Sequence, residues 1–177
     1  MDLTDTIQIS SRFEAQQRPT TVSDCQYTLS LTPAPADNAD DHYPFPDGEH
    51  RYRLFERAAA LIHEHLTLDD PPTALIHCQA GVSRSPAVAT AALAAYRGLH
   101  PREVFPEVRE VRSSAEPRPE VWESAVRYAL SNAPGLEYDA PMPEYHDGSL
   151  LQAVYGRERT NNYDYLYCAP PTEDTPY

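Results

Sequence analysis

The sequence contains no lysine. All 14 basic residues are arginine, against 27 acidic residues, and the formal net charge is -13. Arginine holds planar, bidentate contacts, whereas lysine adds flexible and strongly hydrated positive surface. Binding a phosphate backbone requires clustered positive charge, so this composition argues against nucleic acid as a partner.

Cysteine and long apolar runs are scarce as well. The chain has 3 cysteines among its 177 residues, an odd number at wide spacing, which argues against a disulfide framework and for a reducing compartment. No stretch approaches the roughly 18 apolar residues of a membrane span, and the first ten residues lack the basic segment of a signal peptide. We expect one soluble, cytoplasmic domain without a membrane partner; its oligomeric state stays open.

An acidic surface without lysine repels itself unless salt screens it. The composition resembles that of proteins from extreme halophiles that accumulate salt. We therefore expect a halophilic protein.

Three short apolar runs, at residues 6–9, 27–31 and 74–77, are typical of buried strands. Amphipathic patterns predict helices over residues 50–66, 85–98 and 120–130 and around residues 104–111, where Pro106 leaves an unbroken helix in question. Residues 32–48, rich in Pro and Asp, indicate a loop. Strands alternating with helices predict an α/β fold with helices covering the sheet.

The composition changes after Asn132. Residues 133–177 hold 7 of the 12 tyrosines together with many acidic residues. We expect a main domain at residues 1–132 and an acidic, Tyr-rich tail at residues 133–177, partly ordered and docked on it.

The chain passes from strand to helix through residues 77–85, HCQAGVSRS. Cys78 follows a buried strand and precedes a helix, where the helix dipole favours the thiolate. The small residues that follow allow their N–H groups to converge into an anion-binding nest. Arg84 can then grip two oxygens of a phosphoryl group through its planar guanidinium. The segment predicts a cradle for a tetrahedral dianion with a nucleophile beneath it.

This HC-x5-R segment resembles the phosphate-binding loop of the dual-specificity phosphatases, in the cysteine-based protein tyrosine phosphatase superfamily. Residues 52–66 resemble the helix before the catalytic strand of that family, residues 112–122 resemble the region before its last helix, and the likeness covers residues 5–131. It implies a central mixed, mostly parallel sheet of four to five strands flanked by helices.

The resemblance also implies the roles of the site residues. Cys78 would form the phosphocysteine intermediate, Arg84 would hold the transferred group, Ser85 would stabilise the departing thiolate, and His77 would orient the loop from behind. A plain buried, hydrogen-bonded histidine is the alternative for His77. The phosphate-binding loop would comprise Gln79, Ala80, Gly81, Val82, Ser83 and Arg84.

The family uses an Asp roughly 30 residues before the cysteine as the acid that protonates the leaving group. Asp47 lies between Pro46 and Gly48 in a loop at that spacing. Asp40 and Asp41 are competitors, and a solvated surface carboxylate is the alternative for each of the three.

No metal or other cofactor is expected. His63 and His65 lie two apart on a predicted helix, so they point to different faces and we expect a solvated helix surface. Cys25 and Cys168 are expected to be a packed and an exposed thiol, with a disulfide to Cys78 as the alternative.

The expected function is a protein phosphatase, a hydrolase acting on phosphotyrosine, with phosphoserine and phosphothreonine as further candidate substrates. The first alternative keeps the chemistry but changes the substrate to an inositol phosphate, a phosphoinositide or an RNA 5′-phosphate. Gln79, Ala80 and Val82 are neutral, which weighs against such highly anionic substrates. The second alternative is a phospho-binding module without turnover. Residues 1–132 would form the catalytic domain. The tail tyrosines could cover exposed core, or they could act as a pseudosubstrate or as sites of self-dephosphorylation.

Overall fold

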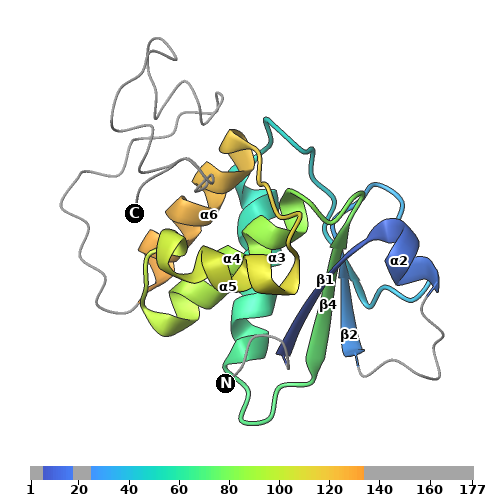
Figure 1. The fold of residues 1–177 in the computed structure, drawn as a ribbon, viewed down its shortest axis with the longest axis horizontal. Helices are drawn as coiled ribbons and strands as arrows, with labels where there is room; N and C mark the ends of the chain where they lie inside the picture. The colour runs from blue at the N-terminus through green and yellow to red at the C-terminus, as the bar shows by residue number, and fades with distance from the viewer. Residues whose placement is uncertain (1–5, 18–24, 134–177) are drawn as a thin grey trace.

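A four-stranded sheet forms the centre of the molecule (Figure 1). The computed structural model describes residues 6–17 and 25–133. The strands lie in the order β1-β4-β2-β3, and every neighbouring pair runs parallel. They are β1 (Ile7–Ser11), β2 (Cys25–Ser30), β3 (Asp41–His42) and β4 (Thr73–Cys78). The α/β class and the mostly parallel sheet are thereby confirmed.

Most of the helices cover one face of this sheet. They are α3 (Tyr52–Leu66), α4 (Arg84–Arg97), α5 (Pro101–Val111) and α6 (Pro119–Asn132), whereas the short α2 (Arg12–Gln17) lies on the other side (Figure 1). Helix α4 is buried from Arg84 to Ala95, and its alanines allow α3, α5 and α6 to pack closely around it. The strands contribute Ile9, Leu29 and Ile76 to the same core.

The second sheet face is covered more thinly. Leu75 packs there against Ala15 of α2 and Ala36 of the loop after β2. Strand β4 is therefore buried on both faces, which explains its continuous apolar run.

The helix that contains Pro106 is a single helix. Helix α5 runs through this proline from Pro101 to Val111. Pro106 removes one N–H from the helix interior, and Val104, Phe105 and Val108 are buried in the core. Their burial offsets the missing hydrogen bond.

Within the described ranges, no helix has the length and apolarity needed to cross a bilayer. The predicted tail at residues 133–177 begins at the last described residue and otherwise lies outside them, and so does Cys168.

Candidate active site

Cys78 is the last residue of β4, and the loop that follows it leads directly into α4. Its neighbour across the sheet is Ser11, the last residue of β1. Only 2% of Cys78 is exposed, and the residue belongs to the core on the helix-covered face. The sulfur therefore lies where a strand ends and the first turn of a buried helix begins.

Two donors converge on the Cys78 sulfur. The Gly81 amide and the Ser85 hydroxyl each lie 3.2 Å from Sγ. Burial raises the pKa of the thiol, but the Ser85 hydroxyl, the Ser85 and Gly81 amides and the Arg84 guanidinium outweigh it, so the pKa is lowered. The environment thus favours the nucleophilic thiolate.

Three carbonyl groups of the loop point outward. The Gln79 oxygen accepts from the Arg12 amide at 3.4 Å, the Ala80 oxygen from Arg112 Nη2 at 3.1 Å, and the Val82 oxygen from the Glu116 amide at 2.8 Å. A trans peptide places its N–H opposite its carbonyl, so the amides of these peptides turn inward. The loop has the geometry of an anion nest.

Gly81 is required by this geometry. Its φ is +71°, and a Cβ built on it would lie 2.7 Å from the carbonyl carbon and oxygen of Ser10. Any side chain would push the loop away from the end of β1.

Arg84 is buried, with 7% of the residue exposed. Its Nη1 donates to the carbonyl oxygens of Leu31 at 2.8 Å and Phe45 at 2.9 Å. Its Nε is buried and has no partner among the residues described. One edge of the guanidinium is therefore anchored, while Nε–H stays available for an anion.

Asp47 lies two residues after Phe45, in the loop that Arg84 anchors. Its Oδ2 is 3.7 Å from Nε of Arg118, and 36% of the Asp47 side chain is exposed. Arg118 in turn donates its backbone amide to the Ser83 hydroxyl, in the loop between β4 and α4, at 3.0 Å. Asp47 is therefore connected, through Arg118, to the loop between β4 and α4.

Asp40 and Asp41, the other candidates for the acid, accept hydrogen bonds from strand β2. Asp40 Oδ2 accepts from the Thr28 amide at 2.7 Å, and Asp41 Oδ2 accepts from the Tyr27 hydroxyl at 2.9 Å. Thr28 is aligned with Leu75, three residues before Cys78 on a parallel strand. Asp40 therefore lies about 10 Å along the strand direction from the level of the sulfur, and Asp41, which is aligned with Leu29 and through it with Ile76, lies about 7 Å from that level.

His77 is fully buried on the opposite sheet face, aligned with Ser10 of β1 and Ser30 of β2. Burial lowers its pKa to about 4, although the Cys78 backbone acts in the other direction. Neither ring nitrogen has a hydrogen-bonding partner within the described part of the chain. The imidazole is neutral at ordinary pH and lies behind the loop.

The two other histidines singled out from the sequence do not meet. His63 Nδ1 lies 3.2 Å from the Tyr128 hydroxyl, whereas His65 contacts the Pro72 carbonyl and stacks on Tyr27. Both are half-buried, so the expected solvated surface is wrong for these two side chains. No group of three or more metal-binding side chains occurs in residues 6–17 and 25–133.

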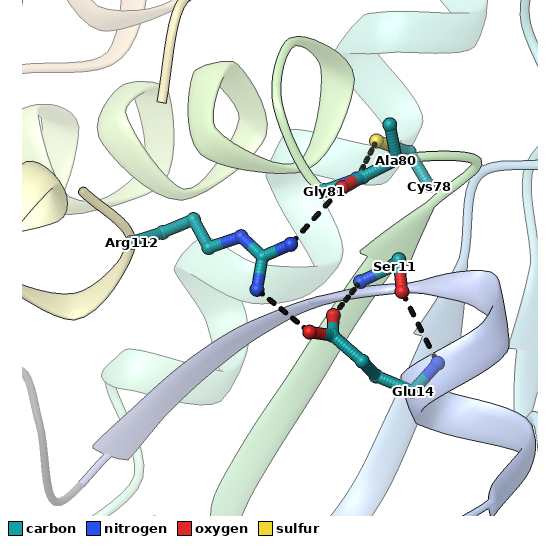
Figure 2. A network of polar contacts seen from close by, with 6 residues as sticks. All are labelled: Ser11, Glu14, Cys78, Ala80, Gly81 and Arg112. Carbon is teal, nitrogen blue, oxygen red and sulfur yellow. Dashed lines mark hydrogen bonds and ion pairs between the residues drawn. The ribbon is translucent and has the colours of Figure 1, made fainter. Parts of the chain in front are cut away.

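Arg112 and Glu14 enter the site without having been assigned a role from the sequence. Figure 2 shows Arg112 between the Ala80 carbonyl and the Glu14 carboxylate. Its Nη1 donates to Glu14 Oε1 at 3.1 Å. The only local signal is the Ser11-x-x-Glu14 spacing of a capping box. The link to Arg112 spans 98 positions, which no local pattern reveals.

The sequence of this chain is similar to those of known phosphatases. Residues 7–129 match the family model for the dual specificity phosphatase catalytic domain. Human dual specificity phosphatase 28 is 43% identical over 54 residues, which make up 30% of this chain. The matched segment spans only 31% of that relative's length.

Solved structures share the fold. The crystal structure of human DUSP28 has a TM-score of 0.61 at 22% identity, covering 72% of this chain and 93% of the other. The Yvh1 phosphatase domain from Chaetomium thermophilum has a TM-score of 0.60 at 19% identity, covering 75% and 95%. A mouse putative dual specificity phosphatase complexed with zinc tungstate has a TM-score of 0.53 at 25% identity, covering 66% and 79%. With the family model matched over residues 7–129, the chain belongs to the dual specificity phosphatase catalytic-domain family.

Proposed function

We propose that the chain is a phosphomonoesterase that needs no metal and removes phosphate from phosphotyrosine, phosphoserine and phosphothreonine in proteins. One observation carries the proposal. The Cys78 sulfur accepts hydrogen bonds from Gly81 and Ser85 at the base of a loop whose peptides turn their amides inward. This arrangement can stabilise a thiolate and hold a dianion above it.

In the first step, Sγ of Cys78 attacks phosphorus in line with the leaving oxygen. The S–P bond forms as the P–O bond breaks, and Arg84 and the loop amides hold the three equatorial oxygens. Asp47, in its acid form, gives its proton to the leaving oxygen. Its contact with Arg118 is long and exposed, so an arriving substrate can displace it.

In the second step, water attacks phosphorus and the S–P bond breaks. The Asp47 carboxylate takes a proton from this water, and inorganic phosphate leaves. The Ser85 hydroxyl stabilises the released thiolate. His77 acts as a positioning residue from behind the loop, because its ring lies on the opposite sheet face.

Hydrolysis of p-nitrophenyl phosphate tests the proposal. The wild-type chain should turn over in EDTA, and Cys78→Ser should lose turnover. Loss of the wild-type activity in EDTA would contradict the metal-free mechanism. Binding of phosphate without any turnover would favour a phospho-binding module.

Asp47→Asn tests the acid. It should lower kcat on an aryl phosphate by about 10²–10⁴-fold and remove the pH limb that reports the acid form. An unchanged kcat and pH profile would remove Asp47 from the mechanism.

We favour phosphorylated proteins over inositol phosphates, phosphoinositides or RNA 5′-phosphates. Gln79, Ala80 and Val82 bring no positive charge to the loop, and the chain carries a net charge of -13. A panel of phosphopeptides and inositol phosphates decides between these classes by kcat/KM. Higher kcat/KM on the inositol phosphates would reverse the assignment.

We propose further that the protein works in a salt-rich cytoplasm, with residues 1–132 as its catalytic domain. The absence of lysine and the excess of acidic residues support the first part. Free, buried Cys78 at the centre of the site requires a reducing compartment to stay active.

A further inference from the structure

The peptide group between Ala80 and Gly81 makes contacts on both sides. Its carbonyl oxygen accepts from Arg112 Nη2 at 3.1 Å, and its N–H donates to the Cys78 sulfur at 3.2 Å. The two groups of a trans peptide point in opposite directions and are joined by a rigid plane. Fixing the carbonyl therefore fixes the aim of the N–H.

Arg112 is itself held in place. Its Nη1 lies 3.1 Å from Glu14 Oε1, and Glu14 Oε2 accepts from the Ser11 amide at 2.6 Å (Figure 2). The Glu14 amide donates back to the Ser11 hydroxyl at 3.1 Å, which completes a capping box at the start of α2. The Arg112 backbone is fixed at the end of α5, where its amide donates to the Val108 carbonyl.

We propose that Arg112, held by Glu14, is a positioning residue that aims the Gly81 amide at the Cys78 sulfur. The inference rests on the proposed function of the same loop, and it adds the chain of contacts from α2 through Arg112 to the nucleophile. A guanidinium at the carbonyl also polarises the peptide, so its N–H becomes a stronger donor to a thiolate or to a phosphoryl oxygen.

The Glu14 carboxylate is suited to this task. The Ser11 amide, followed by the Arg112 side chain, lowers its pKa to about 2. Glu14 therefore stays ionised throughout the pH range in which the thiol titrates, and the link to Arg112 persists.

Two substitutions distinguish positioning of the Gly81 amide from a contribution to folding stability alone. Glu14→Gln removes the charge that holds Arg112, yet glutamine still serves as the third residue of a capping box, so α2 keeps its start. Arg112→Ala removes the contact to the carbonyl directly. The ion pair between Arg97 Nη1 and Glu107 Oε1 at 2.7 Å provides the control. Its side chains are 26% and 40% exposed, against 23% and 48% for Arg112 and Glu14, and it joins α4 to α5 away from the loop.

The readout is the rate at which iodoacetamide alkylates Cys78, followed on its own peptide by mass spectrometry across pH in the full chain. Weaker donation from Gly81 destabilises the thiolate, so the midpoint should move to higher pH. We expect a rise of about half a pH unit or more in Glu14→Gln and in Arg112→Ala. Inhibition by vanadate should weaken about fivefold in the same variants. Arg97→Ala and Glu107→Gln should change neither quantity.

An unchanged midpoint in Glu14→Gln and Arg112→Ala would overturn the inference, as would an equal shift in the two control variants. Alkylation does not depend on turnover. If the wild-type chain hydrolyses no phosphomonoester while Glu14→Gln and Arg112→Ala show the shift, the proposed function is refuted and the positioning role stands.

Discussion

Ser85 contributes the single side-chain hydroxyl bonded to the Cys78 sulfur in the described part of the chain, at 3.2 Å. Its removal leaves the thiolate with one fewer charge-assisted hydrogen bond, which is worth about 1.5–3 kcal/mol. Ser85→Ala should therefore raise the pKa of Cys78, and the acid limb of kcat/KM should move to higher pH by about one unit. The second step should also slow, so that the phosphocysteine intermediate accumulates as a burst of p-nitrophenol.

Thr90→Val is the matched control for Ser85→Ala. Thr90 lies on the same helix and is fully buried, but its hydroxyl donates to the Pro86 carbonyl. It should lower stability without moving the acid limb. An acid limb that moved equally in both variants would show that α4 packing, not the hydroxyl at sulfur, sets the pKa.

Gly81 and Gly48 both have positive φ, but their surroundings differ. A Cβ on Gly81 meets the Ser10 backbone at 2.7 Å, whereas a Cβ on Gly48 meets nothing within 4 Å. Gly48→Ala should cost about 1–3 kcal/mol of unfolding free energy through backbone strain. Gly81→Ala should cost a further 1–3 kcal/mol or so through the clash. Equal losses in chemical denaturation would mean that the loop can move away from β1.

Particular residues show how far the sequence allowed prediction of the site. Cys78, Arg84 and Ser85 come from one short segment, and a strand, a tight loop and a helix position them together. Asp47 could be selected by its spacing, but its distance from Asp40 and Asp41 depended on how β3 pairs with β2. The half-buried state of His63 depended on Tyr128 of α6, 65 positions away, which helical periodicity cannot reveal.

At the scale of elements, the edge of the sheet depends on Asp40. Strand β3 is two residues long, and its pairing with β2 is extended by Asp40, which accepts from the Thr28 amide and donates its own amide to the Thr28 carbonyl. Asp40→Ala leaves a part-buried N–H without its acceptor. We expect a loss of about 1–3 kcal/mol of unfolding free energy, with the pH–rate profile unchanged.

Asp40→Asn should recover most of that stability, because an amide oxygen can still accept from Thr28. A changed pH–rate profile in Asp40→Asn would instead indicate that Asp40 shares the work assigned to Asp47. Chemical denaturation and p-nitrophenyl phosphate hydrolysis across pH measure both outcomes.

The longer helices and strands could be predicted from the sequence, whereas the short strand β3 and the continuity of α5 could not. The four longer helices and the strands β1, β2 and β4 follow from apolar spacing. The two-residue strand β3 was not predicted within the loop rich in Pro and Asp. Its pairing with β2 is supported by the hydrogen bonds of Asp40 and not by apolar residues, so it leaves no apolar pattern in the sequence. Helix α5 continues through Pro106 because tertiary packing outweighs one missing hydrogen bond.

At the scale of the whole molecule, charge sets the response to salt. The net charge of -13 produces repulsion that a Debye length of about 3 Å at 1 M salt largely removes. The ion pairs Arg97–Glu107, Arg112–Glu14 and Arg118–Asp47 have exposed or half-exposed side chains, so their weakening by salt costs little. Tm should therefore rise as KCl increases from 0.1 M to above 1 M.

Sucrose at matched osmolality is the control, since it favours compact states without screening charge. A Tm that rose with sucrose but not with KCl would contradict the halophilic assignment. A larger rise with KCl would support it.

The double anchoring of Arg84 matters for anyone who wishes to capture substrates. One nitrogen of its guanidinium donates to both the Leu31 and the Phe45 carbonyls, so the proposed phosphate clamp also holds the segment that carries the proposed acid, Asp47. An inactive bait made by replacing Arg84 would lose its grip on the ligand and loosen Asp47 at the same time. Baits built on Cys78→Ser or Asp47→Ala keep that fastening intact, and they should retain phosphorylated proteins long enough to be identified.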